Sequence, residues 1–292
     1  MVHIRPIATI EEYHAAARLQ MEVWGMPDME DVVPLNQLLA AHMNGGLVAG
    51  AFDENGAMVG FVYGFVGLTG DGKVKHCSHM AGVLPNQRSG NIGYQLKLFQ
   101  RRYVQKQGLN LITWTFDPLL SLNARLNITK LGAISRTYYH NLYGVMNDSL
   151  NRGLTSDRLA LEWWINSEHV RHYVESEPPR EQPSLQALLD SGAEFALRGE
   201  WYARMPEPLR VTHTAQAETL IIEIPSDFNA IKANAPGLAK AWRRETSHLF
   251  PLLFGKGYAV YDFISEYNGD LRRNFYILGK QVIREIESAA AR

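Results

Sequence analysis

The stretch that decides the fold runs Val83-Leu84-Pro85-Asn86-Gln87-Arg88-Ser89-Gly90-Asn91-Ile92-Gly93-Tyr94-Gln95-Leu96. An apolar strand ends here in a proline-containing turn, and the turn leads directly into a helix. The first amides of such a helix lack intrahelical partners and, with the helix dipole, attract an anion. Small residues at Ser89, Gly90 and Gly93 would let a phosphate approach the backbone, and Arg88 can add a charged contact. The segment alone predicts either a phosphate-binding turn or an ordinary helix start.

Short strand-like runs alternate with amphipathic helical runs on both sides of this segment. Turn residues at 53–56 and 69–72 predict hairpins, and hence antiparallel pairing of the strands that they join. We expect strands at 3–7, 47–52, 58–68, 75–84, 109–116, 134–143 and 159–165, and helices at 10–23, 33–43, 91–107 and 121–131. This order predicts an α/β or α+β fold with a mixed sheet flanked by helices.

The sequence changes character after Ile165, which predicts a first domain at 1–165 and a second, smaller α/β domain at 166–292. Residues 175–183 are rich in Glu, Pro and Arg and predict a linker or exposed turn. Beyond them we expect a helix at 184–190, a strand at 219–224, a helix at 238–254 and strands at 258–264 and 275–278. We interpret the C-terminal part as a degenerate half-repeat of the first domain. It would either cover the substrate cleft or pair with a second copy in a homodimer.

Composition excludes several classes of partner. The chain of 292 residues has 29 Lys and Arg against 30 Asp and Glu, so we expect neither nucleic acid nor an anionic membrane surface as a partner. No apolar run approaches the length of a membrane span. A single cysteine and an N-terminus without the features of a secretory signal predict a cytoplasmic protein.

The order of elements and the quoted segment resemble the GNAT superfamily of acyl-CoA transferases. The family pattern V-x-P-x-x-[RQ]-x-x-G-x-[GA]-x-x-L is matched in register by Val83, Pro85, Arg88, Gly93 and Leu96. Asn91 replaces the first glycine of the pattern, and asparagine is the non-glycine residue that best tolerates a left-handed backbone. Gly90, one place earlier, could supply flexibility. The first domain also resembles a GNAT subgroup with a long C-terminal extension, through 78–80, 114–119, 123–127, 130–133 and 157–158.

This resemblance implies an acyltransferase that uses acetyl-CoA or another acyl-CoA, with no metal, and passes the acyl group to an amine of a small molecule. The pantetheine arm would lie between the strands at 75–84 and 109–116. Amides around Met80 to Val83 would form an oxyanion hole. The implied CoA-binding residues are Met80, Val83, Leu84, Arg88, Ser89, Gly90, Asn91, Ile92, Gly93 and Asn123. Asn123 could equally belong to a capped helix start.

Two residues are candidates for catalysis. His79 lies on the strand before the turn and can serve as the base, although a histidine hydrogen-bonded inside the sheet is an equal interpretation. His76 should face the other side of that strand. Asp117 follows the next strand and can act as base or orient a cationic substrate, but Asp117-Pro118 is also a common turn. Cys77 is interpreted as a small buried apolar residue rather than an acyl carrier.

The family's usual tyrosine, which protonates the departing thiolate, is replaced here by Ile128. Asn127, Tyr138, Tyr139 or solvent would have to take its part. The loss of this tyrosine keeps a second function class open, a non-catalytic CoA-binding or sensor protein, and a purely structural module is a third. Asp157-Arg158 is interpreted as a structural ion pair, Arg243-Arg244 as a solvated helix face and Trp242 as core.

Overall fold

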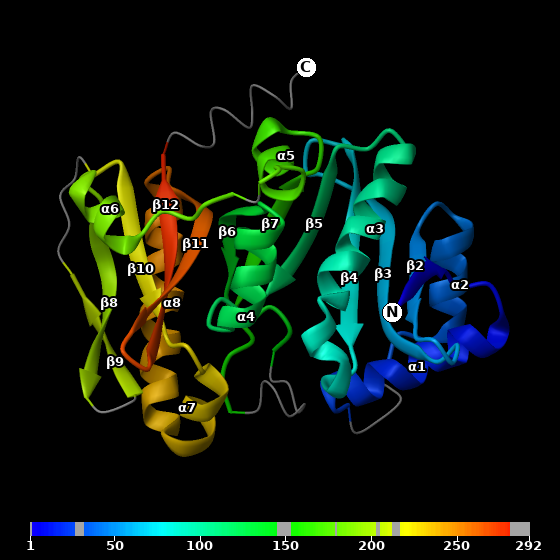
Figure 1. Ribbon diagram of the computed structural model, residues 1–292, viewed down its shortest axis with the longest axis horizontal. Helices are drawn as coiled ribbons and strands as arrows, with labels where there is room; N and C mark the ends of the chain where they lie inside the picture. Colours follow the sequence, from blue (N-terminus) through cyan, green and yellow to red (C-terminus); the bar gives the residue numbers. More distant parts are fainter. Residues whose placement is uncertain are drawn as a thin grey trace. The chain divides into compact units, whose positions relative to one another are not determined.

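The computed structural model describes residues 2–26, 32–144, 153–178, 180–202, 205–211 and 217–280. The chain divides into two compact units, Met1–Trp114 and a second one that begins at Thr115. Strands and helices alternate in both units (Figure 1), and the predicted fold class, a mixed sheet flanked by helices, is confirmed. No helix among the described residues has the length and apolar character needed to cross a membrane.

The first unit holds the segment that decides the fold. Its elements are β1 (His3–Pro6), α1 (Ile10–Trp24), α2 (Leu35–Met43), β2 (Leu47–Phe52), β3 (Met58–Leu68), β4 (Val74–Val83), the 3-10 helix η2 (Pro85–Gly90), α3 (Ile92–Lys106) and the larger part of β5 (Leu111–Phe116), within which the unit ends. The strands lie in chain order, β1-β2-β3-β4-β5. The pairs β1/β2, β2/β3 and β3/β4 are antiparallel, as the hairpin turns predicted, whereas β4 and β5 are parallel.

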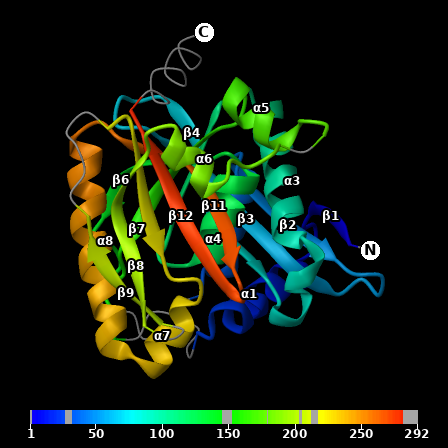
Figure 2. The same cartoon turned by 60° about the vertical axis from the view of Figure 1, so that its left-hand side comes forward.

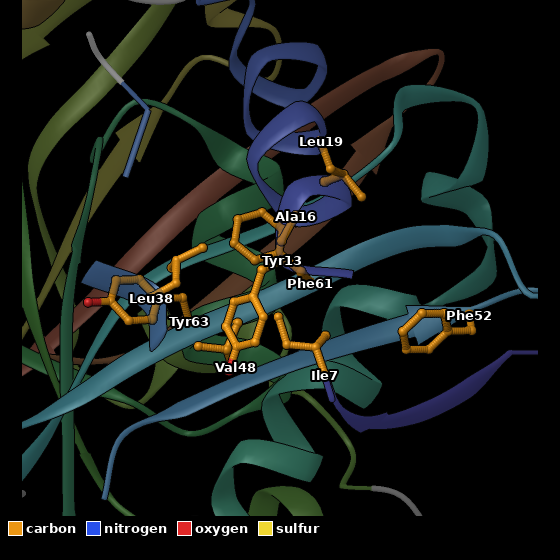
Figure 3. Close-up of a cluster of buried hydrophobic side chains, with 9 residues drawn as sticks. All are labelled: Ile7, Tyr13, Ala16, Leu19, Leu38, Val48, Phe52, Phe61 and Tyr63. Atoms are coloured by element: carbon orange, nitrogen blue, oxygen red, sulfur yellow. The ribbon is translucent and has the colours of Figure 1, made fainter. Parts of the chain in front are cut away.

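Helices cover both faces of this sheet. On one face α1 and α2 pack against alternate strand residues, including Val48, Phe61 and Tyr63 (Figure 3). On the other face α3 buries Ile92 and Leu96 against the intervening strand residues. This arrangement follows from the two-residue period of the strands, because successive side chains point to opposite faces. The result is a sheet held rigid from both sides, with β4 in its interior.

The boundaries of α1 are encoded by its own residues. Thr9 Oγ accepts a hydrogen bond from Glu12 N at 3.3 Å, and the Glu12 carboxylate accepts one from Ala8 N at 2.7 Å. The reciprocal capping box between Thr9 and Glu12 satisfies donors that a helix start otherwise leaves unpaired. Hydrogen bonding from Arg5 and burial act on the same carboxylate, and the net effect lowers the pKa of Glu12 to about 2. At the other end Gly25 has a left-handed backbone (φ 63°), which ends the helix.

The second unit holds the remaining strands of the sheet, which Figure 2 shows from another side. Its elements are α4 (Ser121–Ala124), the π-helix η3 (Arg125–Lys130), β6 (Ile134–Tyr139), β7 (Arg158–Trp164), α5 (Glu168–Val174), α6 (Leu185–Asp190), β8 (Glu194–Tyr202), β9 (Met205–Arg210), β10 (Thr219–Ile224), α7 (Phe228–Asn234), α8 (Pro236–Gly255), β11 (Ala259–Asn268) and β12 (Leu271–Gly279). The strands are ordered β7-β6-β11-β12-β10-β8-β9.

Several features of the second unit differ from the expectations. The helix expected at 121–131 is a short α-helix followed by a π-helix, and α5, α7, β8 and β9 were not anticipated. The compact units also differ from the domains expected at 1–165 and 166–292, which remain a prediction. Strand β6 pairs with β7 on one side and with β11 on the other, through Ser135 and Val260. The strands at 134–164 therefore pack with the C-terminal part of the chain.

Candidate active site

The turn between β4 and α3 has the left-handed residue that the sequence predicted. Asn91 has φ 56° and ψ 18° and joins the 3-10 helix η2 to α3. Gly90 is not among the residues with positive φ, so the strained position is that of the asparagine. Arg88 is exposed, and its Nε donates to Val83 O at 3.3 Å. The guanidinium is thus held over the end of β4, beside the start of α3.

The η2 helix reduces the number of amides that can meet an anion. A 3-10 helix bonds each amide to the carbonyl three residues earlier, and Gln87 N donates to Leu84 O in this way. In α3 the first amide bonded to a helical carbonyl is that of Gln95, which donates to Asn91 O at 3.1 Å. Ile92 and Gly93 occupy the first positions of α3, where amides have no intrahelical partner. An anion at the start of α3 would therefore meet the amides of Ile92 and Gly93 rather than amides throughout the turn.

The parallel strands β4 and β5 pair only over a short length. Their ladder joins His76 to Ile112 and Cys77 to Thr113, and it ends there, although the structure describes every residue of both strands. Ser78 on β4 and Trp114 on β5 are the first residues beyond the last pair. From Ser78 to Val83 the main chain of β4 is paired with β3 alone. We call this unpaired side of residues 78–83 the open edge.

A β-bulge in β4 sets which groups face the open edge. Tyr63 pairs with Met80 and Gly64 with Ser78, so His79 is an extra residue in β4. Leu84 N donates to Val59 O at 3.0 Å and therefore points to β3. Because main-chain groups alternate along a strand, Gly82 and Met80 also point to β3, and Ala81 and Val83 point to the open edge. Of the amides around Met80 to Val83 that the sequence analysis expected at the oxyanion hole, only those of Ala81 and Val83 face the open edge.

His79 lies at this bulge and packs against aromatic rings. Its ring centroid is 5.7 Å from that of Tyr63 and 6.1 Å from that of Phe65. The residue keeps an exposed edge, but these rings shield the imidazole from water and lower the pKa of His79 below its usual value. The lowered pKa favours the neutral imidazole, the form that a base requires.

His76 faces α3 instead, as predicted. Its Nε2 lies 3.1 Å from Gln100 Nε2, and burial, assisted by the nearby charge of Lys97, lowers the pKa of His76 to about 4. Cys77, between the two histidines, has a thiol whose pKa is raised by burial. A thiol of raised pKa is a poor nucleophile, which supports its interpretation as a packing residue.

Sequence reasoning missed Lys97, a buried lysine behind the point where the ladder ends. Its side chain is on α3 and only 3% exposed. Nζ donates to Ser78 Oγ at 2.9 Å and to Gln100 Oε1 at 3.1 Å, and lies 3.6 Å from the ring centroid of Trp114. Burial lowers the pKa of Lys97 to about 7. A titratable amine therefore contacts the first unpaired residue of each strand.

Asp117 is in the second unit and is engaged by the protein. It is 7% exposed, its Oδ1 accepts from Leu119 N at 2.9 Å, and its Oδ2 accepts from Arg243 Nη2 at 2.5 Å. The first bond is that of an Asx turn, which was the alternative interpretation. The carboxylate that was a candidate base is therefore half of a buried ion pair.

The second unit also holds the candidate CoA ligand Asn123 and the candidate proton donors, and these residues differ in their exposure and contacts. Asn123 is exposed on α4, and Tyr139 is 43% exposed. Ile128 and Asn127 are buried in the π-helix. Tyr138 OH donates to Asp157 Oδ2 at 2.8 Å, and burial together with that carboxylate raises the pKa of Tyr138. A phenol in this state is a weak proton donor at neutral pH.

The interpretation of Arg243 as part of a solvated helix face requires correction. Arg243 is not on a solvated face but is only 5% exposed, because it lies on the same stripe of α8 as Ala239, Trp242 and Thr246, whereas Arg244 points outward. The interpretation of Asp157-Arg158 as a structural ion pair stays a prediction. Arg158 Nη1 donates to the main-chain carbonyl of Asp157. Among the described residues no group of three or more His, Cys, Asp or Glu could hold a metal ion.

No protein-family model and no curated protein matches the chain. Solved structures that do match include the ribosomal-protein-S18-alanine N-acetyltransferase of Escherichia coli, at 16% identity and TM-score 0.44, over 56% of this chain and 94% of the other. A GNAT-family acetyltransferase of Streptococcus pneumoniae matches at 15% identity and TM-score 0.44, over 56% and 98%. Aminoglycoside 6'-acetyltransferase type Ii matches at 16% and 0.42, over 56% and 97%. Identities this low do not carry a function over to this chain, so its chemistry is inferred from its own residues.

Proposed function

We propose that the protein transfers an acyl group from an acyl-CoA thioester to an amine while both substrates are bound. The observation that carries the proposal is one continuous segment, residues 78–93, with main-chain groups on an open strand edge at one end and unpaired helix-start amides at the other. A CoA thioester needs both, a strand edge for its amide-containing arm and donors for its diphosphate. No protein nucleophile is required, because holding amine and thioester together supplies much of the rate.

Different residues of this segment would bind the diphosphate, the pantetheine arm and the reacting groups. Ile92 and Gly93 would donate main-chain hydrogen bonds to the diphosphate, with Arg88 adding charge after it leaves Val83 O. The main-chain carbonyl of Ala81 and the main-chain groups of Val83 would bond the pantetheine arm, whereas Ala81 N, next to the bulge, would stabilise the oxyanion that forms on the thioester carbonyl. His79 would accept a proton from the amine. The acceptor would be a small-molecule amine, and the acyl group acetyl or a larger one.

One observation favours a second candidate function, a CoA-binding protein without turnover. Ile128 is fully buried where the family's proton-donating tyrosine would stand, and Tyr138 is held by Asp157. Release of CoA thiol from acetyl-CoA in the presence of amines separates the two functions. CoA binding without thiol release under any amine would leave only the second.

Arg88→Glu tests the diphosphate site. The substitution places a carboxylate beside the start of α3, where it repels the diphosphate and removes a charged contact, so CoA should bind about tenfold more weakly or worse. Isothermal titration calorimetry with CoA measures the change. The matched control is Arg102→Glu, which makes the same charge reversal at an exposed position later in α3. Equal affinities of the two variants would remove Arg88 and the turn from the CoA site.

A further inference from the structure

A buried lysine of the first unit lies between β4 and β5 at the point where their pairing ends. Ser78 and Trp114 are the first residues beyond the last β4/β5 pair. Lys97 Nζ is 2.9 Å from Ser78 Oγ and 3.6 Å from the ring centroid of Trp114. Lys97 comes from α3, which covers this face of the sheet. Its ammonium group therefore closes the α3 side of this point.

The groups at this point are polar and buried. Ser78 is 4% exposed and Lys97 is 3% exposed, and Nζ also donates to Gln100 Oε1 at 3.1 Å. Ser78 Oγ accepts a hydrogen bond from Lys97, and a hydroxyl that accepts one bond can still donate its own hydrogen. Trp114 is half-buried, so a ligand meets the indole first. An acyl group that reaches this point meets a cation and a hydroxyl, whereas a plain hydrocarbon chain is better matched by apolar side chains.

The length of the open edge limits the acyl group that fits there. In the proposed function the thioester carbonyl lies at Ala81 N and the CoA arm runs toward Val83, so the acyl group extends the other way, toward Ser78. Ala81 and Ser78 lie opposite Val62 and Gly64, which are two residues apart on β3. Two strand residues span about 7 Å. A chain of three or four carbons, at about 1.5 Å per bond, covers this distance together with one hydrogen bond.

We propose that the acyl donor is the CoA monothioester of a short dicarboxylic acid, such as malonyl-CoA or succinyl-CoA, and that Lys97 and Ser78 bind its free carboxylate. The position of the acyl group rests on the proposed function, which places CoA on the open edge. Lys97 Nζ forms an ion pair with the carboxylate, and Ser78 donates its hydroxyl hydrogen to it. Both side chains are buried, so water screens this attraction little. Acetyl and longer hydrocarbon acyl groups lack the carboxylate and are poorer donors.

Binding of such a carboxylate also takes up a proton. The pKa of Lys97 is about 7 in the ligand-free chain, so at pH 8 most chains hold the neutral amine. A carboxylate beside it favours the ammonium form. The neighbouring groups keep their protonation state at pH 8, because the pKa of His76 is about 4 and burial raises that of Cys77. Strands β1, β2 and β3 present apolar side chains to this face, and Arg101 on α3 carries a charge that does not titrate in this range.

Calorimetry without an acyl acceptor tests the proposal with two matched pairs of thioesters, malonyl-CoA against propionyl-CoA and succinyl-CoA against butyryl-CoA. Within each pair the chain length is equal and a methyl group replaces the carboxylate. At least one dicarboxylic thioester should bind the native chain about tenfold or more tightly than its neutral partner. At pH 8 its binding should take up close to one proton, measured in buffers of different ionisation enthalpy, and the neutral partner should take up none.

Three variants locate the effect. Lys97→Met should lose both the affinity difference and the proton uptake, yet bind butyryl-CoA at least as tightly as the native chain, which also shows that it is folded. Ser78→Ala should reduce the affinity difference and keep the proton uptake, because the lysine remains. Lys106→Met, at an exposed position on the same helix, should keep both.

The outcomes separate this proposal from the transferase function. Tighter binding of a dicarboxylic thioester that depends on Lys97, without thiol release under any amine, supports the carboxylate site and contradicts the transferase. Thiol release from acetyl-CoA, with equal affinities within both pairs, supports the transferase and overturns the carboxylate site. Binding of the dicarboxylic thioesters without proton uptake also overturns it, as does an affinity difference that persists in a Lys97→Met variant that still binds butyryl-CoA.

Discussion

Ala81→Pro is expected to lower the rate of acyl transfer by about a hundredfold or more while the sheet stays folded, because it removes one main-chain donor from the open edge. Proline has no amide hydrogen, and an oxyanion that loses a preorganised donor forms far more slowly. The same change within a paired strand would break the ladder. At Ala81 it does not, since this amide points away from β3 and the side chain is exposed.

Steady-state thiol release measures this effect, and Ala81→Ser is the matched control because it keeps the amide. The two variants should melt at similar temperatures and bind CoA with similar affinity, since free CoA has no thioester carbonyl for Ala81 N to bond and the diphosphate donors at Ile92 and Gly93 are unchanged. A proline variant that stays folded and retains the native kcat would show that Ala81 N takes no part in the reaction.

Lys97→Met is expected to remove most of the increase in stability that the native protein shows between pH 7 and pH 9. The pKa of Lys97 is about 7 in the folded chain, below the ordinary lysine value of 10.5. Between these two values the unfolded chain holds a proton that the folded chain has lost. The free energy of unfolding therefore rises with pH across this window, by up to about 1.4 kcal/mol per pH unit. Below pH 7 both states are protonated and this contribution no longer changes.

Urea unfolding at pH 7, 8 and 9 measures the slope for the native chain and the variant. Lys106→Met is the matched control, because Lys106 is exposed at the end of the same helix and should leave the slope unchanged. If the free energy of unfolding of Lys97→Met depends on pH as that of the native chain does, Lys97 stays protonated throughout this range and its pKa is not lowered by burial.

The elements of the first unit were predictable because local chemistry specifies them. Turn residues at 53–56 and 69–72 specified two hairpins, and Asn91 took the left-handed backbone that its type tolerates. Strand β9 was missed because Pro206 and Pro208 argue against a strand. The structure places β9 at the end of the strand order, where a lost main-chain donor costs little.

The buried charges were harder to predict, yet they left a signal. Lys97, Gln100, Arg101 and Val104 share one buried stripe of α3 at spacings of three and four, and Arg243 holds the equivalent place on α8. A polar residue on an apolar stripe is normally excluded by its desolvation cost, so such residues need partners from elsewhere in the fold. Those partners, Ser78 for Lys97 and Asp117 for Arg243, are distant in sequence, and only the structure identifies them.

The central claim is that one segment, residues 78–93, binds both the arm and the diphosphate of CoA. A titration of the isotope-labelled protein with CoA, followed through its backbone amide resonances, tests this directly. We expect saturable shifts at Gly93, at the opening of α3, and at Ala81 and Val83 on the open edge, with one affinity for all three. A lack of saturable binding, or shifts that leave these three amides unmoved, would contradict the account.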